Sequence, residues 1–433
     1  MPSEDRAKRT IKKLLWVYII MLLIEGGLRK WFVPFLSEPL LIARDPIVLL
    51  IYLVALQGGL FPRNGFVAVT IIMALMAFFF GLIAESSNLI VTVYGMRINF
   101  LQIPLIFVIG QALDYRDVVQ IAKVMIILAV PQIAIMVLQF ISPQGSFINR
   151  NVGGGEGIMG ALGKFRPPGT FSFITGPAAY FPLVLAFVIG LMIHEGKKYT
   201  WLCAIGAVCA ALAVPVSISR LLALSSAIVL LTAIYAYIRL PNPPKVLLRG
   251  MVVGAIVLLI VPLLPVFDDA TEAFTERMVT STGGEAGGVR EEVAGRYFSG
   301  MITYPLKAMG EAPITGHGIG KGSNVGARLL TGERNFLLGE SEWEKAILEM
   351  GPLLGFLFII VRVAIVVFIF RYANSALSRG NAMPILIFSS CFLLILNGQW
   401  GPPMILGFAV LGGGLALAAT KTSSVENEAQ AST

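Results

Sequence analysis

Two apolar runs enclose a long polar segment: LRGMVVGAIVLLIVPLLPVF (residues 248–267) precedes it and AILEMGPLLGFLFIIVRVAIVVFIF (residues 346–370) follows it. Each run is long enough for a helix to cross the hydrocarbon of a bilayer, which takes about 20 apolar residues. Between them, residues 268–345 carry twelve acidic and eight basic residues, a formal charge of −4 in a chain whose net charge is +8. The stretch therefore predicts a membrane protein with one large extramembrane loop.

The composition extends this prediction to the whole chain. Of its 433 residues, 56% are hydrophobic and only 13% are charged, whereas soluble domains carry about 25% charged residues. The first apolar run, Leu14–Ile24, lacks a small-residue cleavage site, so we expect no cleavable signal peptide. The three cysteines all fall inside apolar runs and the chain has only two histidines, which predicts buried, inert thiols and argues against a metal site. We expect no cofactor and no nucleic-acid partner.

We expect an all-α polytopic membrane protein with about twelve transmembrane helices and one large outer loop containing short helices, because strands span a bilayer only in closed barrels. Glu25, Arg29 and Lys30 interrupt the first apolar run, so we expect there a short helix that ends at Glu25, followed by an interfacial segment. The predicted spans lie near residues 14–35, 46–61, 66–84, 98–113, 118–141, 176–194, 200–216, 220–238, 248–267, 346–370, 383–397 and 402–420.

The basic residues of the short connections predict the orientation. With a cytoplasmic amino terminus, the cytoplasmic segments hold sixteen Lys and Arg and the opposite segments hold eight, which agrees with the positive-inside rule. Residues 1–267 are then helices one to nine, 268–345 the large outer loop, 346–420 helices ten to twelve, and 421–433 a disordered cytoplasmic tail. Both termini are predicted to be cytoplasmic.

Four arginines on the outer side are candidates for binding an anion. Arg166 is held by two following prolines just before a span, and Arg220 lies at the outer end of another. Arg220 can simply anchor its helix end by snorkelling, or it can bind a pyrophosphate through its guanidinium fork. Arg290 and Arg296 flank two glutamates in the loop, where a solvated helix face is the alternative interpretation.

Glu340 and Glu342 directly precede the tenth span and are the candidate general bases. The alternative is that these carboxylates only stabilise a helix amino terminus. The run from Gly316 to Gly322, with His317, Gly318 and Gly320, is either a flexible turn before a helix or a backbone nest for a phosphate. Arg362 lies inside the tenth span, nearer its cytoplasmic end, and we expect it to have a structural partner.

Four motifs resemble the O-antigen ligase and O-antigen polymerase superfamily, bacterial inner-membrane glycosyltransferases of the GT-C type. Arg166-Pro-Pro-Gly-Thr-Phe171 is similar to the family's Arg-x-x-Gly-Thr-Phe, and Ser217-Ile-Ser-Arg220 to its Ser-x-Ser-Arg. Residues 311–320, EAPITGHGIG, resemble its Glu-x-Pro-hydrophobic-x-Gly-x-Gly-x-Gly stretch, and residues 347–355, ILEMGPLLG, its Leu-x-Glu-x-Gly helix start. The resemblance covers most of the chain in motif order and predicted topology.

The sequence departs from the family at one position. Many members, ligases especially, place a His-Asn pair about nine residues before the helical glutamate, whereas counting back from Glu349 reaches Glu340 and Ser341. His317 belongs to the preceding glycine run and does not match that position. We therefore favour a polymerase-like branch over a ligase.

The resemblance implies a metal-independent enzyme of the bacterial inner membrane with a periplasmic loop. Its donor would be a glycan on undecaprenyl pyrophosphate embedded in membrane lipid, since no nucleotide sugar is available outside. Arg166, Arg220, Arg290 and Arg296 would hold the pyrophosphate and Glu340 or Glu342 would activate the acceptor hydroxyl. A chain-length regulator and a flippase would be partners. Three alternatives remain open: a ligase acting on lipid A core or protein, a transporter of lipid-linked sugars, and a non-catalytic assembly partner.

Overall fold

The structure is a computed structural model that describes residues 2–84, 88–152, 165–241, 272, 299–332, 338–339 and 341–421. All regular secondary structure in this part of the chain is helical. The helices are, in order, α1 (Pro2–Gly27), η1 (Leu28–Phe32), η2 (Pro34–Leu36), η3 (Pro39–Ile42), α2 (Asp45–Gln57), α3 (Gly65–Ile83), α4 (Leu89–Met96), η4 (Arg97–Leu101), α5 (Ile103–Ala112), α6 (Tyr115–Ile141), η5 (Phe147–Asn149), α7 (Thr175–His194), η6 (Gly196–Tyr199), α8 (Thr200–Ser217), α9 (Arg220–Arg239), η9 (Ser299–Thr303), α13 (Tyr304–Glu311), α14 (Asn324–Thr331), α15 (Glu342–Met350), α16 (Pro352–Ser378), α17 (Met383–Leu396) and α18 (Pro403–Ala418).

Eight helical stretches in the described residues are long and apolar enough to cross a membrane, so the chain is a multi-pass membrane protein. They are Pro39–Gln57, Gly65–Ile83, Leu89–Ala112, Tyr115–Ile141, Thr175–His194, Gly196–Ser217, Arg220–Arg239 and Pro352–Ser378. The apolar helices α17 and α18 are shorter. The predicted ninth span, 248–267, lies outside the described residues, as do the first part of the predicted loop and nearly all of the predicted tail.

Two expectations need correction. First, α1 is not a short helix that ends at Glu25, because it runs for 26 residues to Gly27. Second, the predicted tenth span does not begin at residue 346: α15 and α16 are separate helices, divided at Gly351. Gly351 has φ 82°, a conformation that other residues rarely adopt, and Pro352 then begins α16.

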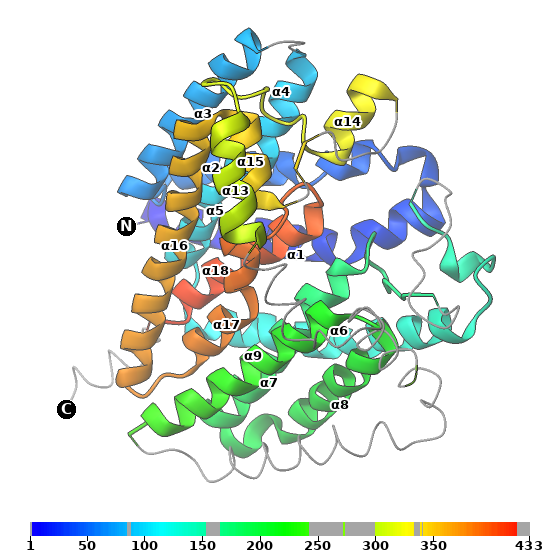
Figure 1. Cartoon of the computed structure of the whole chain (residues 1–433). Coiled ribbons are helices and arrows are strands. Elements are labelled where there is room, and N and C mark those ends of the chain that lie inside the picture. Colours follow the sequence, from blue (N-terminus) through cyan, green and yellow to red (C-terminus); the bar gives the residue numbers. More distant parts are fainter. Residues whose placement is uncertain are drawn as a thin grey trace.

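The core of the bundle lies around α7, α17, α18 and α5. In α7, 83% of the spanning window is buried inside the protein, against 28% in α3, so α7 is central and α3 peripheral. Figure 1 shows α16 passing along the side of this core, with α13, α14 and α15 gathered near α3 and α4 and away from α7 and α8. The three cysteines are buried and free, as the sequence predicted.

One face of the bundle, which we call the terminal face, joins the beginning of α1 to the end of α18. Lys12 Nζ lies 2.6 Å from the Asp117 carboxylate at the start of α6. Lys421, just past α18, donates to the carbonyl of Gln111 at 2.7 Å. The amide of Ala382 donates to His194 Nε2 at 3.0 Å, which adds the end of α7 and the start of α17. Helix ends that the sequence places on the same side of the membrane therefore contact one another in the structure.

The opposite face, which we call the loop face, holds the other helix ends. Lys30, after α1, donates to the carbonyl of Gly169, before α7, at 2.5 Å. Trp343 of α15 donates through Nε1 to the carbonyl of Leu396, the last residue of α17, at 2.9 Å. Because α7 and α8 pack together and are joined only by the short η6, the end of α8 also lies at this face. The candidate site is built here.

Candidate functional site

Helix α15 presents three charged side chains toward the interior of the protein. Ser341 caps its amino terminus, and the Ser341 and Glu344 side chains complete a capping box that fixes where the helix begins. Glu342, Lys345 and Glu349 follow at helical spacings of three and four, so they share one side of α15. All three are buried.

Glu342 is held between two cations. Its Oε2 lies 2.6 Å from Lys345 Nζ and its Oε1 lies 2.9 Å from NH1 of Arg362. Arg362 is wholly buried and also donates to the carbonyls of Ile395 at 2.7 Å and Gly398 at 2.8 Å. Its guanidinium lies 3.9 Å from the centre of the Trp400 ring. Both oxygens of Glu342 are therefore committed to internal partners.

Arg362 thus has the structural partner expected for it, but not the expected place. We predicted that it lies nearer the cytoplasmic end of the tenth span. Its side chain instead reaches Glu342 and the carbonyl of Gly398, beyond the end of α17, at the loop face. The difference arises because α16 begins at Pro352, which puts Arg362 in the first half of that helix.

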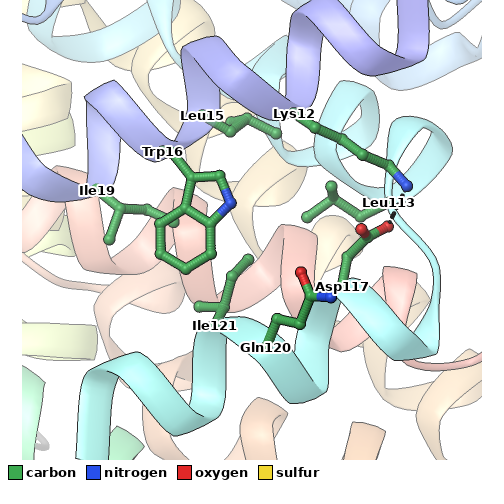
Figure 2. A pocket seen from close by; sticks show the side chains of 8 residues that line it. All are labelled: Lys12, Leu15, Trp16, Ile19, Leu113, Asp117, Gln120 and Ile121. Carbon is green, nitrogen blue, oxygen red and sulfur yellow. Dashed lines mark ion pairs between the residues drawn. The ribbon is translucent and has the colours of Figure 1, made fainter. Parts of the chain in front are cut away.

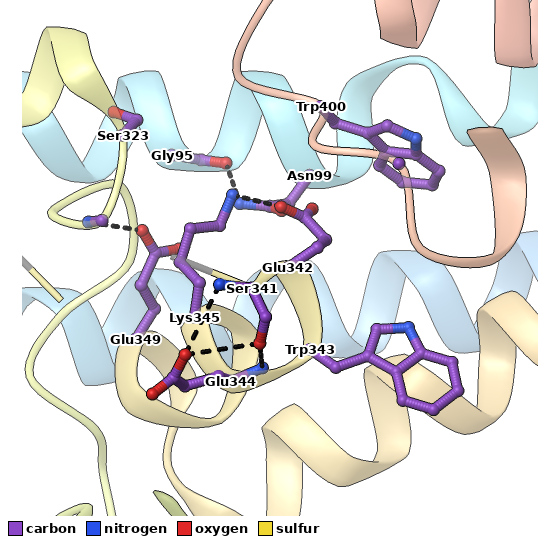
Figure 3. Close-up of polar contacts among 12 residues, drawn as sticks. Gly95, Asn99, Ser323, Ser341, Glu342, Trp343, Glu344, Lys345, Glu349 and Trp400 are labelled. Atoms are coloured by element: carbon purple, nitrogen blue, oxygen red, sulfur yellow. Dashed lines mark hydrogen bonds and ion pairs between the residues drawn. The ribbon is translucent and has the colours of Figure 1, made fainter. Parts of the chain in front are cut away.

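Glu349 has a different environment from Glu342 (Figure 3). Its Oε1 accepts a hydrogen bond from the amide of Gly322 at 2.7 Å. Its Oε2 is buried and has no hydrogen-bond partner among the described residues. Burial raises the pKa of the Glu349 carboxyl, against the opposing effects of Lys345 and of the Gly320 and Gly322 amides. A carboxyl with a raised pKa and one uncommitted oxygen is suited to accepting a proton. We call Glu342, Lys345, Glu349 and Arg362 the α15 cluster.

The glycine run 316–322 wraps the end of α15. The amide of His317 donates to the carbonyl of Leu348 at 2.8 Å, and that of Gly318 to the carbonyl of Glu349 at 3.1 Å. Gly316 has φ 72°, and a Cβ there would lie 2.3 Å from the Glu349 carbonyl oxygen. The run therefore uses its glycines to approach α15 closely. The amides of His317, Gly318 and Gly322 bond inside the protein and are not open to a phosphate in this structure.

The Ser217–Arg220 turn joins α8 to α9 at the loop face. Ile218 has φ 47° and is the sole non-glycine residue with positive φ in the described part of the chain. It is fully buried, and Ser219 caps α9 by accepting from the amide of Leu222 at 3.4 Å. Arg220 is half-buried, and its side chain has no hydrogen bond or ion pair to the described residues. A strained turn thus holds a guanidinium that has no partner in the part of the chain that the structure describes.

The Arg166 turn packs against the end of α1. Lys30 donates to the Gly169 carbonyl, and Thr170 donates through Oγ1 to the carbonyl of Leu23 at 2.7 Å. Gly169 itself has φ 62°. Arg166 therefore belongs to a turn that is fastened to α1, on the face that also carries the α15 cluster.

Sequence reasoning missed a second charged group, which we call the α1 cluster: Glu25, Arg29 and Arg44. Glu25 Oε1 lies 3.3 Å from Arg29 NH1, and its Oε2 lies 3.2 Å from Arg44 Nε. Arg44 also donates to the carbonyl of Pro403, which ties the start of α2 to the start of α18. The i,i+4 spacing of Glu25 and Arg29 was the available signal for the first pair. No local spacing reveals Arg44.

Three predicted site residues, Glu340, Arg290 and Arg296, lie outside the described residues. Within the described ranges no group of three or more His, Cys, Asp or Glu could hold a metal ion. A pocket between α1 and α6, lined by Lys12, Trp16 and Asp117, lies at the terminal face (Figure 2). Its volume of about 10 Å³ has room for about one water molecule. It is too small for a saccharide.

The Arg166 turn and the Ser217–Arg220 turn thus lie at the same face of the bundle as the glycine run and the α15 cluster. Comparison with protein-family models and with curated proteins finds no match to this chain.

Proposed function

We propose that the chain is a membrane glycosyltransferase that polymerises saccharides carried on a polyprenyl pyrophosphate. The resemblance of its four motifs to the O-antigen ligase and polymerase superfamily supports this function. The arrangement of the described residues supports it independently, because all four motifs lie at the loop face. We assign this face to the periplasmic side of a bacterial inner membrane.

The observation that carries the proposal is the Ser217–Arg220 turn. A non-glycine residue in the left-handed region costs on the order of 1–3 kcal/mol, and such strain is found most often at functional sites. Here the strained Ile218 is fixed by complete burial, and Arg220 follows it without a partner among the residues that the structure describes. The guanidinium of an arginine held in this way can donate two parallel hydrogen bonds to the oxygens of a phosphate.

In the proposed reaction an acceptor sugar hydroxyl attacks the anomeric carbon of the donor saccharide. The new glycosidic bond forms as the bond between that carbon and the pyrophosphate oxygen breaks. Polyprenyl pyrophosphate leaves with its bonding electrons, and Arg220 and Arg166 stabilise the charge that develops on it. The hydroxyl proton passes to a carboxylate.

The structure bears on which carboxylate takes that proton. Glu342 is a poor acceptor because Lys345 and Arg362 occupy both of its oxygens. Glu340 stays a candidate from sequence, and Glu349 joins it because its Oε2 has no hydrogen-bond partner within the described ranges. We assign Glu342 instead to holding α15 against α16.

The test compares Arg220→Ala with wild type in proteoliposomes supplied with lipid-linked saccharides extracted from cells lacking the protein. Wild type should produce a ladder of longer lipid-linked glycans, and Arg220→Ala should lose it at an equal protein level. Arg239→Ala is the matched control, because Arg239 ends the same helix at the terminal face, where it stacks on Tyr235. An unchanged ladder in Arg220→Ala would remove this residue from the reaction.

A further inference from the structure

The end of α1 buries a lysine without a carboxylate partner. Lys30 is 1% exposed. Its Nζ bonds to the carbonyl of Gly169 at 2.5 Å and lies 4.5 Å from the centre of the Trp31 ring. It forms no ion pair with any carboxylate of the described residues. A buried ammonium normally pairs with an anion, because leaving water costs it much more free energy than one carbonyl returns.

Gln132 of α6 adds a buried amide donor beside it. The side chain is 5% exposed. Its Oε1 accepts from the Thr170 amide at 3.3 Å, which fixes the orientation of the Gln132 amide group, whereas the single hydroxyl proton of Thr170 goes to the carbonyl of Leu23. Its Nε2 is therefore a donor, and it is buried with no partner among the described residues. The indole Nε1 of Trp31 is likewise a buried donor with no partner there.

Two of these side chains, Lys30 and Gln132, meet at one residue, Gly169. A Cβ at this position would lie 2.2 Å from Gln132 Nε2, while the Gly169 carbonyl accepts from Lys30. The same carbonyl also accepts from Gln139 Nε2 at 3.3 Å, so both of its lone pairs are used. The neighbourhood thus has an excess of donors and of positive charge, and a deficit of acceptors.

An anion with several oxygens would remove both imbalances at once, because each oxygen accepts more than one hydrogen bond. We propose that Lys30, Gln132 and Trp31 form a binding site for a phosphate-type group, and that its occupant is the diphosphate of a lipid. The assignment to a lipid diphosphate rests on the proposed function, whereas the anion site itself does not. Arg166 begins the turn that contains Gly169, so this site extends the pyrophosphate-binding role predicted for it.

Two further observations agree with a buried anionic occupant. Gln132 lies nine residues before Ile141, the last residue of α6, which is about 13 Å along the helix axis. Gln132 is therefore recessed into the bundle, well below the end of α6 at the loop face. Burial also lowers the pKa of the Lys30 ammonium to about 7, as expected for a cation without its counter-charge.

The experiment measures binding to the full chain in nanodiscs by its effect on thermal unfolding. Three probes separate the sources of the diphosphate: inorganic pyrophosphate, polyprenyl diphosphate at a fixed mole fraction, and phosphatidylglycerol alone. The variants are Gln132→Glu, which keeps Oε1 and replaces the amide donor by an anionic oxygen, and Lys30→Met, which removes the charge. Gln120→Glu is the control, because Gln120 is exposed at the other end of α6.

We expect polyprenyl diphosphate to stabilise wild type and Gln120→Glu, and its Kd to rise at least about tenfold in Gln132→Glu and Lys30→Met, since a charge-assisted hydrogen bond is worth roughly 1.5–3 kcal/mol. Stabilisation by inorganic pyrophosphate alone would keep the anion site and overturn the lipid occupant. Equal responses in all variants, a response to phosphatidylglycerol as large as that to the diphosphate, or no response to any probe would overturn the site.

The same variants separate this inference from the proposed function. If wild type elongates saccharides and Gln132→Glu does so equally well, the anion site fails while the glycosyltransferase stands. If wild type binds the diphosphate lipid selectively but forms no longer glycan, the site stands and the proposed function fails.

Discussion

Replacing Glu342 by glutamine removes the charge that Lys345 and Arg362 both contact. The glutamine oxygen can still accept one neutral hydrogen bond, but two buried cations then lack their carboxylate. Breaking a buried ion pair by removing one partner costs about 3–5 kcal/mol, because the remaining charge stays buried. We expect a loss of about 3 kcal/mol or more in the free energy of unfolding.

The assay is equilibrium unfolding in detergent micelles titrated with sodium dodecyl sulfate, followed by tryptophan fluorescence. Trp400, one of the five tryptophans, stacks on Arg362, so part of the fluorescence signal comes from the cluster itself. Glu311→Gln is the matched control: Glu311 also faces a lysine, Lys307 at 3.6 Å, but both side chains are exposed. Exposed pairs contribute little, so this control should unfold like wild type.

A double-mutant cycle distinguishes an ion pair from general packing. Glu342→Gln combined with Arg362→Gln should lose less stability than the sum of the single changes, by about 1–3 kcal/mol. If Glu342→Gln is as stable as wild type and strictly additive with Arg362→Gln, the structural role assigned to Glu342 is refuted. Glu342 would then return as a candidate base.

Three further predictions follow from individual contacts. Burial lowers the pKa of Lys30 to about 7, so the folded protein binds fewer protons than the unfolded chain between about pH 7 and 10.5. The melting temperature of wild type should therefore rise with pH across this window. Lys30→Met should be more stable than wild type at pH 7 and should lose the part of the pH dependence that Lys30 causes. Gly316→Ala should destabilise strongly through its backbone contact with Glu349, while Gly310→Ala, which has open space, should not; equal melting temperatures would contradict the account of the glycine run. Glu340→Gln should abolish elongation without a change in melting temperature if Glu340 is the base. Normal elongation in this variant would leave Glu349 as the remaining candidate base.

The helices could largely be predicted from sequence. The predicted span 220–238 corresponds to Arg220–Arg239, and the predicted span 118–141 corresponds to Tyr115–Ile141. The two agree because the hydropathy of the sequence falls where a helix leaves apolar surroundings for polar ones. The division at Gly351 was missed because the residues on both sides of it are apolar. Hydropathy does not register a backbone φ of 82°.

The candidate site was less predictable. The outer arginines and the importance of the α15 carboxylates could be inferred from motif order. The pairing of Glu342 with Arg362, or of Glu25 with Arg44, joins residues about twenty positions apart on different helices, and only packing creates it. The unpartnered amide of Gln132 is a property of the fold, since its sequence neighbours give no sign of it.

The most direct test of the central claim is the product length formed by purified wild-type protein from polyprenyl-pyrophosphate-linked saccharides. The account predicts a ladder of longer lipid-linked glycans, with one polyprenyl pyrophosphate released for each saccharide added. Donor that stays at its original length, whether it remains in place or is moved across the bilayer, would contradict it.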